Sequence, residues 1–155
     1  MVKKEIVVIG GGSGAGFINE ILKRSDASNY SVTLVSPHPY NVFMPATARM
    51  TVTSQEALED SALISYDGLI ARGVKFLLGR VSRVIDGAVD LEYGQSVKYD
   101  FLVVATGSSW EGPFSFPDGD AAVKEHIKHW REMLSAASSV VVIGGGAVGI
   151  GALST

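Results

Sequence analysis

The sequence predicts an α/β fold in which a central parallel sheet is covered by crossover helices and carries an inserted β-meander. Three observations predict it. An apolar, β-branched run at residues 6–9 leads into a glycine-rich segment at residues 10–16, and a second such pair occupies residues 140–149. Between the two, short alternating runs separated by turn residues begin at residue 74. An apolar run that ends in closely spaced glycines is typical of a strand that turns directly into a helix.

Both glycine-rich segments have the spacing that suits a pyrophosphate. The first reads G-x-G-x-x-A and the second G-x-G-x-x-G, with motif residues Gly10, Gly12, Ala15, Gly144, Gly146 and Gly149. Small residues let the backbone approach the phosphates, and the first N–H groups of the helix then face the anion. A tight turn without a ligand is the less favoured alternative. A Walker A loop is excluded because Phe17 stands where a lysine is required.

The chain after the first glycine segment predicts a crossover helix and a second parallel strand. Apolar residues recur at helical spacing over residues 17–22, and Lys23 and Arg24 suit the C-terminal end of a helix. Residues 31–35 are rich in β-branched residues and predict the strand. At its tip, where a carboxylate usually binds a ribose, the chain has Ser36, which can bind a ribose hydroxyl or cap the following turn.

The middle of the chain predicts a meander and then a return to the sheet. Apolar residues alternate over residues 74–78 and 89–93, with Asp86-Gly87 and Gly94-Gln95 as turns. Residues 101–104 predict a buried strand of the sheet.

A linker and a helix are expected before the second glycine segment. Glycines and prolines mark the linker between residues 112 and 119, and the helix after it has an apolar stripe of Val123, Ile127, Trp130 and Leu134. Residues 40–60 give no clear pattern.

Composition limits the kind of protein. The 155 residues suit one domain, and a formal net charge of −3 without a basic run disfavours nucleic acid or an anionic membrane as partner. The absence of cysteine excludes disulfides and thiolate metal sites.

No apolar run is long enough to cross a membrane. The first residues leave no room for a targeting peptide, and Val2 leaves no myristoylation site. We therefore expect a soluble, cytoplasmic protein.

Two other groups of residues favour structural roles. His126 and His129 share one helix face, but a solvated polar face is expected rather than a metal site, because no third ligand is evident. The acidic residues Glu56, Glu59 and Asp60 are expected to form exposed surface.

The ordered set of elements resembles the Rossmann-like FAD-binding domain of the pyridine nucleotide-disulfide reductase fold, whose members are FAD- and NAD-binding flavoprotein oxidoreductases. The matching parts are the first glycine segment, the meander, residues 99–108 (YDFLVVATGS) and the second glycine segment. The chain is most similar to the apoptosis-inducing-factor-like or ferroptosis-suppressor-like NAD(P)H:quinone oxidoreductases, with type II NADH dehydrogenases next. This likeness rests on Asn41-Val42 followed by Arg49, on Ile64-Ser65-Tyr66, and on Gly107-Ser108 followed by Gly112-Pro113-Phe114.

The resemblance implies FAD as the cofactor and assigns positions around it. They are Gly10, Gly12, Ser13, Gly14 and Ala15 at the pyrophosphate; Ser36, Pro37 and His38 at the adenosine ribose; Val81 at the adenine; Pro45 and Arg49 towards the flavin; and Ala105, Thr106 and Gly107 on the inner wall.

The resemblance also implies a domain organisation and an activity. Residues 1–112 would form the FAD-binding domain, residues 113–139 a linker and amphipathic helix, and residues 140–155 the first strand and glycine loop of a truncated NAD(P)H-binding domain. In such proteins NAD(P)H reduces FAD and the flavin passes electrons to a quinone. Two alternatives stay open: a flavin-binding module without turnover, acting as a carrier, pigment or regulator, or a remnant that binds nothing and has an interaction role.

A run of four apolar residues at 140–143 would invite aggregation if it were left in water. We therefore expect these residues to join the sheet, or to pair with a second copy of the chain in a homodimer.

Overall fold

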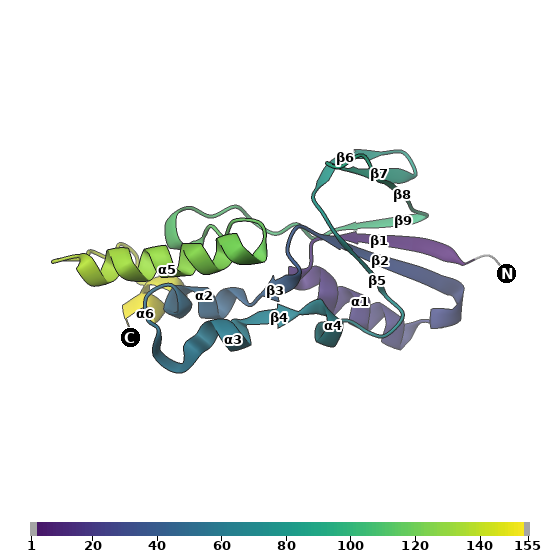
Figure 1. Cartoon of the computed structure of the whole chain (residues 1–155). Coiled ribbons are helices and arrows are strands. Elements are labelled where there is room, and N and C mark those ends of the chain that lie inside the picture. The colour runs from purple at the N-terminus through teal and green to yellow at the C-terminus, as the bar shows by residue number, and fades with distance from the viewer. Residues whose placement is uncertain (1–2, 154–155) are drawn as a thin grey trace. The chain divides into compact units, whose positions relative to one another are not determined.

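The computed structural model describes residues 3–153, and the chain divides into two compact units (Figure 1). The first unit is Met1–Asn41 with Ser65–Ser108, and the second is Val42–Ile64 with Ser109–Thr155. The chain crosses from one unit to the other within β3 (Tyr40–Val42), within β4 (Leu63–Ser65), which pairs with β3, and again between Ser108 and Ser109. The domain boundaries expected from the sequence stay a prediction, because compactness alone does not say which segment holds which cofactor.

The first unit is built on a four-stranded parallel sheet with the order β5-β2-β1-β9. Its strands are β1 (Lys4–Ile9), β2 (Tyr30–Ser36), β5 (Lys75–Leu78) and β9 (Phe101–Val104). Helix α1 (Gly12–Arg24) follows β1, and the short η1 turn (Ala27–Asn29) then leads to β2. Strand β2 pairs in parallel with β1. The predicted α/β fold with a parallel sheet and a crossover helix is therefore confirmed.

The sheet carries a core on each face, because successive side chains of a strand point to opposite sides. Ile6 and Val8 of β1 face α1, where they pack with Ala15 and Ile18. Val7 and Ile9 of the same strand face the meander, where they pack with residues of β7 (Ala88–Leu91). Figure 1 shows α1 and the meander on opposite sides of the sheet. Both cores therefore meet at β1, the strand that leads into the first glycine segment.

The meander consists of β6 (Val81–Ile85), β7 and β8 (Ser96–Lys98), paired antiparallel. Its two predicted turns are confirmed, since Gly87 and Gly94 have φ values of +70° and +83°. The inclusion of residues 74–78 in the meander was wrong. Residues 75–78 form β5, which pairs in parallel with β2, and Phe76 packs on Tyr66 with ring centroids 4.9 Å apart. An alternating pattern predicts a half-buried strand but does not say which strand it pairs with.

Strand β9 has the predicted bounds but is not fully buried. Phe101 is 54% exposed and Val104 is 63% exposed. The reason is the position of β9 at an edge: β1 pairs with one side of it, and no strand of residues 3–153 pairs with the other.

The second unit is helical. It contains α2 (Met44–Met50), η2 (Gln55–Ala57), α3 (Leu58–Ala62), η3 (Gly112–Phe114), α5 (Asp120–Ala136) and α6 (Ala147–Leu153), whereas α4 (Tyr66–Leu69) belongs to the first unit. The predicted stripe of α5 is confirmed for Val123 and Ile127, which are buried. No helix within residues 3–153 combines the length and apolar character that a membrane span requires. The expected cytoplasmic location stays a prediction.

An ion pair joins α5 to α3 and corrects one sequence prediction. Two guanidinium nitrogens of Arg131 donate to the Glu59 carboxylate at 2.9 and 2.6 Å, and its Nε donates to the Met50 carbonyl at 2.9 Å. The Arg131 guanidinium lowers the pKa of Glu59 below its ordinary value. Glu59 is therefore a partly buried anchor of α5 and not simply exposed acidic surface.

The strand expected at residues 140–143 is absent from this structure, so the prediction that it joins the sheet was wrong for residues 3–153. Val141 is 82% exposed and Ile143 is 95% exposed. The helix expected after the second glycine segment does form, as α6. A strand is stable only when neighbouring strands accept its hydrogen bonds, and none does so here among the described residues.

Candidate functional site

The carboxyl ends of the parallel strands meet at one edge of the first unit. Backbone hydrogen bonds tie these ends together: Gly10 N–H donates to Val35 O at 2.9 Å, Ala105 N–H to Ile9 O at 2.8 Å, and Gly79 N–H to Ser36 O at 2.8 Å. The chain proceeds from β1 to β2 on one side, and β9 later adds to the other side of β1. Ligands of open α/β sheets bind where the strand order reverses in this way.

The first residue of the glycine segment must be glycine. Gly10 has a φ of +96°, a conformation that side chains rarely adopt, and a Cβ there would collide with the Ala105 carbonyl group. Two further glycines are constrained by packing. A Cβ on Gly11 would collide with the Tyr66 phenol ring, and one on Gly14 would lie 2.9 Å from Val8 Cγ1. The loop at Gly10 and Gly11 therefore has no side chains, and its backbone packs directly against Ala105 and Tyr66.

The N-terminus of α1 suits an anion. Within residues 3–153 no side chain caps this helix, and its first turn has no acidic residue. Gly12 and Ser13 are exposed there, while Ala15 is buried in the core behind them. Uncapped N–H groups and the helix dipole together favour a phosphate at such an end. The exposed Gly12 and Ser13 are therefore suited to an anion, and the predicted contact of this segment with a pyrophosphate stays a prediction.

Ser36, at the tip of β2, is turned into the protein. It is 2% exposed, its Oγ lies 3.4 Å from the Tyr66 hydroxyl, and the His38 N–H donates to it at 3.3 Å. Burial raises the pKa of the Tyr66 phenol. Capping of the following turn, one of the two roles expected for Ser36, is thus the role that the geometry supports, and a ribose contact stays a prediction.

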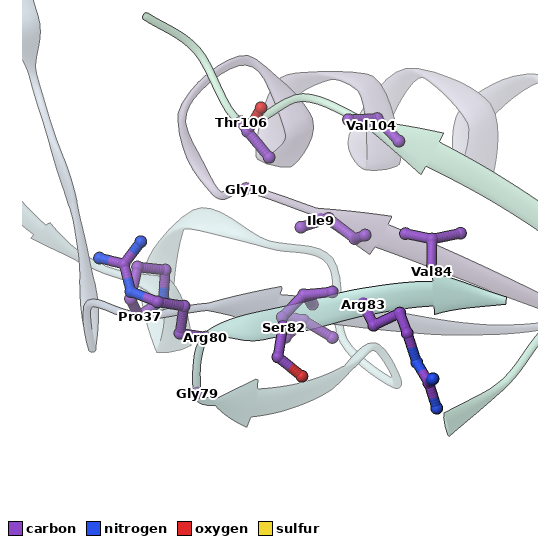
Figure 2. Close-up of a pocket in the computed structure, with 12 residues that line it drawn as sticks. Ile9, Gly10, Pro37, Gly79, Arg80, Ser82, Arg83, Val84, Val104 and Thr106 are labelled. Carbon is purple, nitrogen blue, oxygen red and sulfur yellow. The ribbon is translucent and has the colours of Figure 1, made fainter. Parts of the chain in front are cut away.

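A cavity of about 340 Å³ lies between this sheet edge and β6 (Figure 2). Four of the predicted site residues line it: Gly10, Pro37, Val81 and Thr106. They come from the ends of three parallel strands and from the start of the meander, so the structure brings together residues far apart in the sequence.

Two arginines of the cavity wall were missed by the sequence analysis. Arg80 and Arg83 flank the start of β6. Arg83 donates to Asp90 from Nε at 3.3 Å and from Nη2 at 2.9 Å, and this contact lowers the pKa of Asp90. Arg80 forms a longer ion pair with Glu92, at 3.9 Å. A basic residue directly before Val81, the predicted adenine neighbour, is the signal that could have found Arg80.

The other predicted residues lie as follows. Gly107 lies just beyond β9, where it is exposed and has a φ of +75°. The His38 ring stacks on the Tyr40 ring, with centroids 6.3 Å apart. Pro45 and Arg49 belong to α2 in the second unit. Their predicted place beside the flavin stays a prediction.

The histidines of α5 take part in packing. The His126 Nε2 lies 3.1 Å from the Pro113 carbonyl oxygen, and its ring packs against Phe116 and Trp130. The expected solvated face was therefore wrong for His126, although His129 is exposed. Within residues 3–153 no three His, Cys, Asp or Glu side chains are grouped so that they could hold a metal ion.

A parallel sheet with a side-chain-free loop between β1 and α1, and a meander on the opposite face, defines a dinucleotide-binding fold of the flavoprotein type. The chain belongs to the pyridine nucleotide-disulphide oxidoreductase family, whose sequence profile matches residues 4–152. FAD is the cofactor of this family.

Apoptosis-inducing factor homologues are among the relatives that match most of the chain. The chain is 31% identical to apoptosis-inducing factor homolog B of Dictyostelium discoideum over 149 residues, covering 94% of this chain and 37% of that protein. It is 28% identical to apoptosis-inducing factor 1 of Saccharomyces cerevisiae, covering 94% of this chain and 38% of that protein. The chain thus spans somewhat more than a third of the length of these relatives.

Solved structures support the fold. The sulfide:quinone oxidoreductase of Aquifex aeolicus superposes with a TM-score of 0.64 at 23% identity, over 85% of this chain and 32% of that one. The putidaredoxin reductase–putidaredoxin complex superposes with a TM-score of 0.63 at 24% identity, over 98% of this chain and 39% of that one.

Proposed function

We propose that this chain is an FAD-binding flavoprotein of the NAD(P)H:quinone oxidoreductase type and that its first unit holds FAD at the glycine segment 10–14. One observation carries the proposal. The bend at Gly10 leaves no space for a Cβ beside Ala105, and it opens onto the uncapped N-terminus of α1 at the reversal point of the sheet. A ligand-free turn does not need this combination.

The roles proposed for individual groups follow from their places. The N–H groups of Gly12, Ser13 and Gly14 bind the phosphates, because they are the first donors of α1 and have no partner within the helix. Pro37 and Val81 border the adenosine in the cavity. Bound FAD supplies the capacity to take a hydride from NAD(P)H and to pass electrons to a quinone.

Turnover requires more than flavin binding. Hydride transfer needs the donor held about 3–3.5 Å from the acceptor, and therefore a formed nicotinamide site. The second glycine segment would open such a site, but residues 140–143, which lie directly before it, form no strand in the part of the chain that the structure describes. This observation favours a second candidate function for the 155-residue chain: a flavin-binding module that does not turn over.

The first test is the colour of the purified protein. The full chain is purified without added cofactor, its absorbance is recorded, and the released ligand is identified by mass. We expect a flavin absorption band and the mass of FAD. A colourless protein that also fails to take up added FAD overturns the proposal and leaves the non-binding remnant.

A matched pair of variants locates the flavin. Gly10→Ala should lower the flavin content severalfold, because a Cβ there meets Ala105. Gly16→Ala should leave it unchanged, because a Cβ at Gly16 has no neighbour within 4 Å among the described residues. Equal flavin content in the two variants would contradict the assigned loop.

Addition of NADH under nitrogen separates the two candidate functions. Bleaching of the flavin band, reversed by a quinone, supports the oxidoreductase. A band that stays unchanged supports the module without turnover. Light scattering of the same sample measures whether the chain forms the homodimer that the sequence predicts.

A further inference from the structure

The first glycine segment has a buried side and an exposed side. Gly11 is buried, whereas the next two residues, Gly12 and Ser13, are exposed. The buried side meets Tyr66, the first residue of α4, because a Cβ placed on Gly11 would collide with the hydroxyl oxygen and the ring of that tyrosine. The Tyr66 hydroxyl therefore fills the space that a side chain at residue 11 would need.

Tyr66 is held in place by its own neighbours. It is 3% exposed, and its ring packs on Phe76 of β5 with centroids 4.9 Å apart. The start of α4 is fixed as well, because the Asp67 N–H donates to the hydroxyl of the capping residue Ser65 at 3.3 Å. A side chain packed in this way keeps one rotamer, so the hydroxyl has a defined position beside Gly11.

A second contact joins the segment around α4 to helix α1. The Asn19 side chain donates from Nδ2 to the Leu69 carbonyl oxygen at 2.8 Å, and its Oδ1 accepts from the Ala71 N–H at 2.9 Å. The segment therefore contacts both the loop before α1 and the middle of that helix. A change confined to the Tyr66 hydroxyl acts on the loop, because Asn19 still holds the helix.

The Tyr66 hydroxyl also reaches the tip of β2. Its oxygen lies 3.4 Å from Ser36 Oγ, which accepts from the His38 N–H at 3.3 Å. One buried hydroxyl thus contacts the loop expected at the pyrophosphate and the turn expected at the ribose. Burial raises the pKa of this phenol, so it stays neutral around pH 7 and adds no negative charge where phosphates are expected.

We propose that Tyr66 is a positioning residue of the cofactor site, whose hydroxyl holds the backbone of Gly11 so that the N–H groups of the next residues are aimed at the pyrophosphate. The inference rests on the proposed function, because it gives Tyr66 a role behind the loop at residues 10–14. Donors bind an anion well only when their geometry is fixed beforehand, and residues packed behind them supply that rigidity. Without the hydroxyl, the loop loses its support on the buried side.

The first test removes only the hydroxyl. Tyr66→Phe keeps a ring that can pack on Phe76 and lacks the oxygen beside Gly11. The full chain, freed of flavin, is titrated calorimetrically with FAD. The dissociation constant of Tyr66→Phe should be about fivefold higher than that of the wild type, the effect of losing one hydrogen-bonding group. Tyr93→Phe is the matched control, because it removes the hydroxyl of a tyrosine that is 90% exposed, and its dissociation constant should equal the wild-type value.

A spectroscopic readout separates positioning from stability. The ³¹P resonances of FAD bound at saturation report the hydrogen bonds that its phosphates accept. They should shift in Tyr66→Phe and keep their wild-type positions in Tyr93→Phe. The melting temperature of each flavin-free variant is recorded first, and binding is measured well below it, so that unfolding does not enter the comparison.

A second pair of variants tests the same contact by size. In the wild-type background, Gly11→Ala should weaken FAD binding, because the added methyl group displaces the phenol. In a Tyr66→Leu background, which lacks the hydroxyl, the same methyl group occupies the vacated space and should strengthen FAD binding. Residue 11 has a φ of −92°, so an alanine there brings no backbone strain to either variant.

The outcomes separate this inference from the proposed function. If the wild type binds FAD and Tyr66→Phe binds it equally well, the inference is wrong and the FAD proposal stands. A weaker affinity that Tyr93→Phe shares, or one with unchanged ³¹P resonances, also overturns the inference. If Tyr66→Phe does not fold, the size pair decides, and a weakening by Gly11→Ala in both backgrounds overturns it. If the wild type binds no FAD, both proposals fail.

Discussion

Residues 6–16 and residues 140–150 share a sequence pattern, but only the first segment forms a strand. The bends are alike: Gly10 has a φ of +96° and Gly144 a φ of +110°, and a helix begins shortly after each. The apolar runs differ, since Ile9 is 7% exposed and its counterpart Ile143 is 95% exposed.

The comparison shows which features of the motif form from a few consecutive residues and which need contacts with distant parts of the chain. A positive φ at glycine and the start of a helix depend on a few consecutive residues, so both segments have them. A parallel strand depends on neighbours. Strand β1 has β2 on one side and β9 on the other, and residues 140–143 pair with no strand among the described residues.

The largest expected effect comes from truncating the two equivalent isoleucines. Ile9→Ala should lower the free energy of unfolding by about 2–5 kcal/mol, because it leaves a cavity in the core beside the meander. Ile143→Ala should change it by less than about 0.5 kcal/mol, because the side chain is exposed. Urea denaturation followed by circular dichroism measures both. Equal losses would mean that Ile143 is buried in solution.

The two bend glycines give the next contrast. Gly10→Ala should lower the free energy of unfolding by about 2–3 kcal/mol, because the strain of a positive φ adds to a collision with Ala105. Gly144→Ala has the same φ strain but no neighbour within 4 Å among the described residues, so about 1 kcal/mol is expected. A larger loss for Gly144→Ala in the same urea experiment would contradict this ranking.

The second glycine of each segment tests the contact with Tyr66. Gly11→Ala should lower the free energy of unfolding by about 1–3 kcal/mol, because its Cβ would overlap the phenol ring. Gly145→Ala is the matched control and should cost less than about 0.5 kcal/mol, since nothing described lies near it. In a Tyr66→Leu background the penalty of Gly11→Ala should fall by at least half, as a double-mutant cycle measures. An unchanged penalty would show that Tyr66 is not the obstacle.

A smaller effect distinguishes two ion pairs of the second unit: the Arg131–Glu59 pair, which joins α5 to α3, and the exposed Lys128–Glu132 pair within α5. Glu59→Gln should lower the free energy of unfolding by about 1 kcal/mol at neutral pH, because it breaks the contact with Arg131. The pKa of Glu59 is lowered by folding, so this contribution is present above its ordinary value of 4.5 and is lost as the pH falls through the folded value. The melting temperatures of wild type and variant should therefore converge in acid.

Glu132→Gln is the control for that experiment, since its pair with Lys128 is 3.9 Å long and both side chains are about two-thirds exposed. Its melting temperature should follow the wild type at every pH. A difference between wild type and Glu59→Gln that persists at low pH would show that the carboxylate charge is not what stabilises α5.

The sequence predicted those parts of the fold that short-range patterns determine. Strand β1, helix α1 and strand β2 were predicted because their apolar periodicity changes at the glycines. The turns at Gly87 and Gly94 were predicted because only glycine readily takes their backbone conformation.

The features that were missed depend on contacts between distant residues. The pairing of β5 with β2, the edge position of β9 and the Arg131–Glu59 contact join segments far apart in the chain. Of the candidate site, the glycine segment was predictable from its spacing. Arg80 was not, because its place depends on how the meander lies over the sheet.

The measurement that tests the central claim most directly is a titration of the ¹⁵N-labelled full chain with FAD, followed through its amide resonances. We expect the largest shifts at the amides of Gly10, Gly12, Ser13 and Gly14, and no shift at those of Gly144, Gly146 and Gly149. Shifts centred on the second glycine segment, or a first segment that does not respond to saturating FAD, would contradict this expectation.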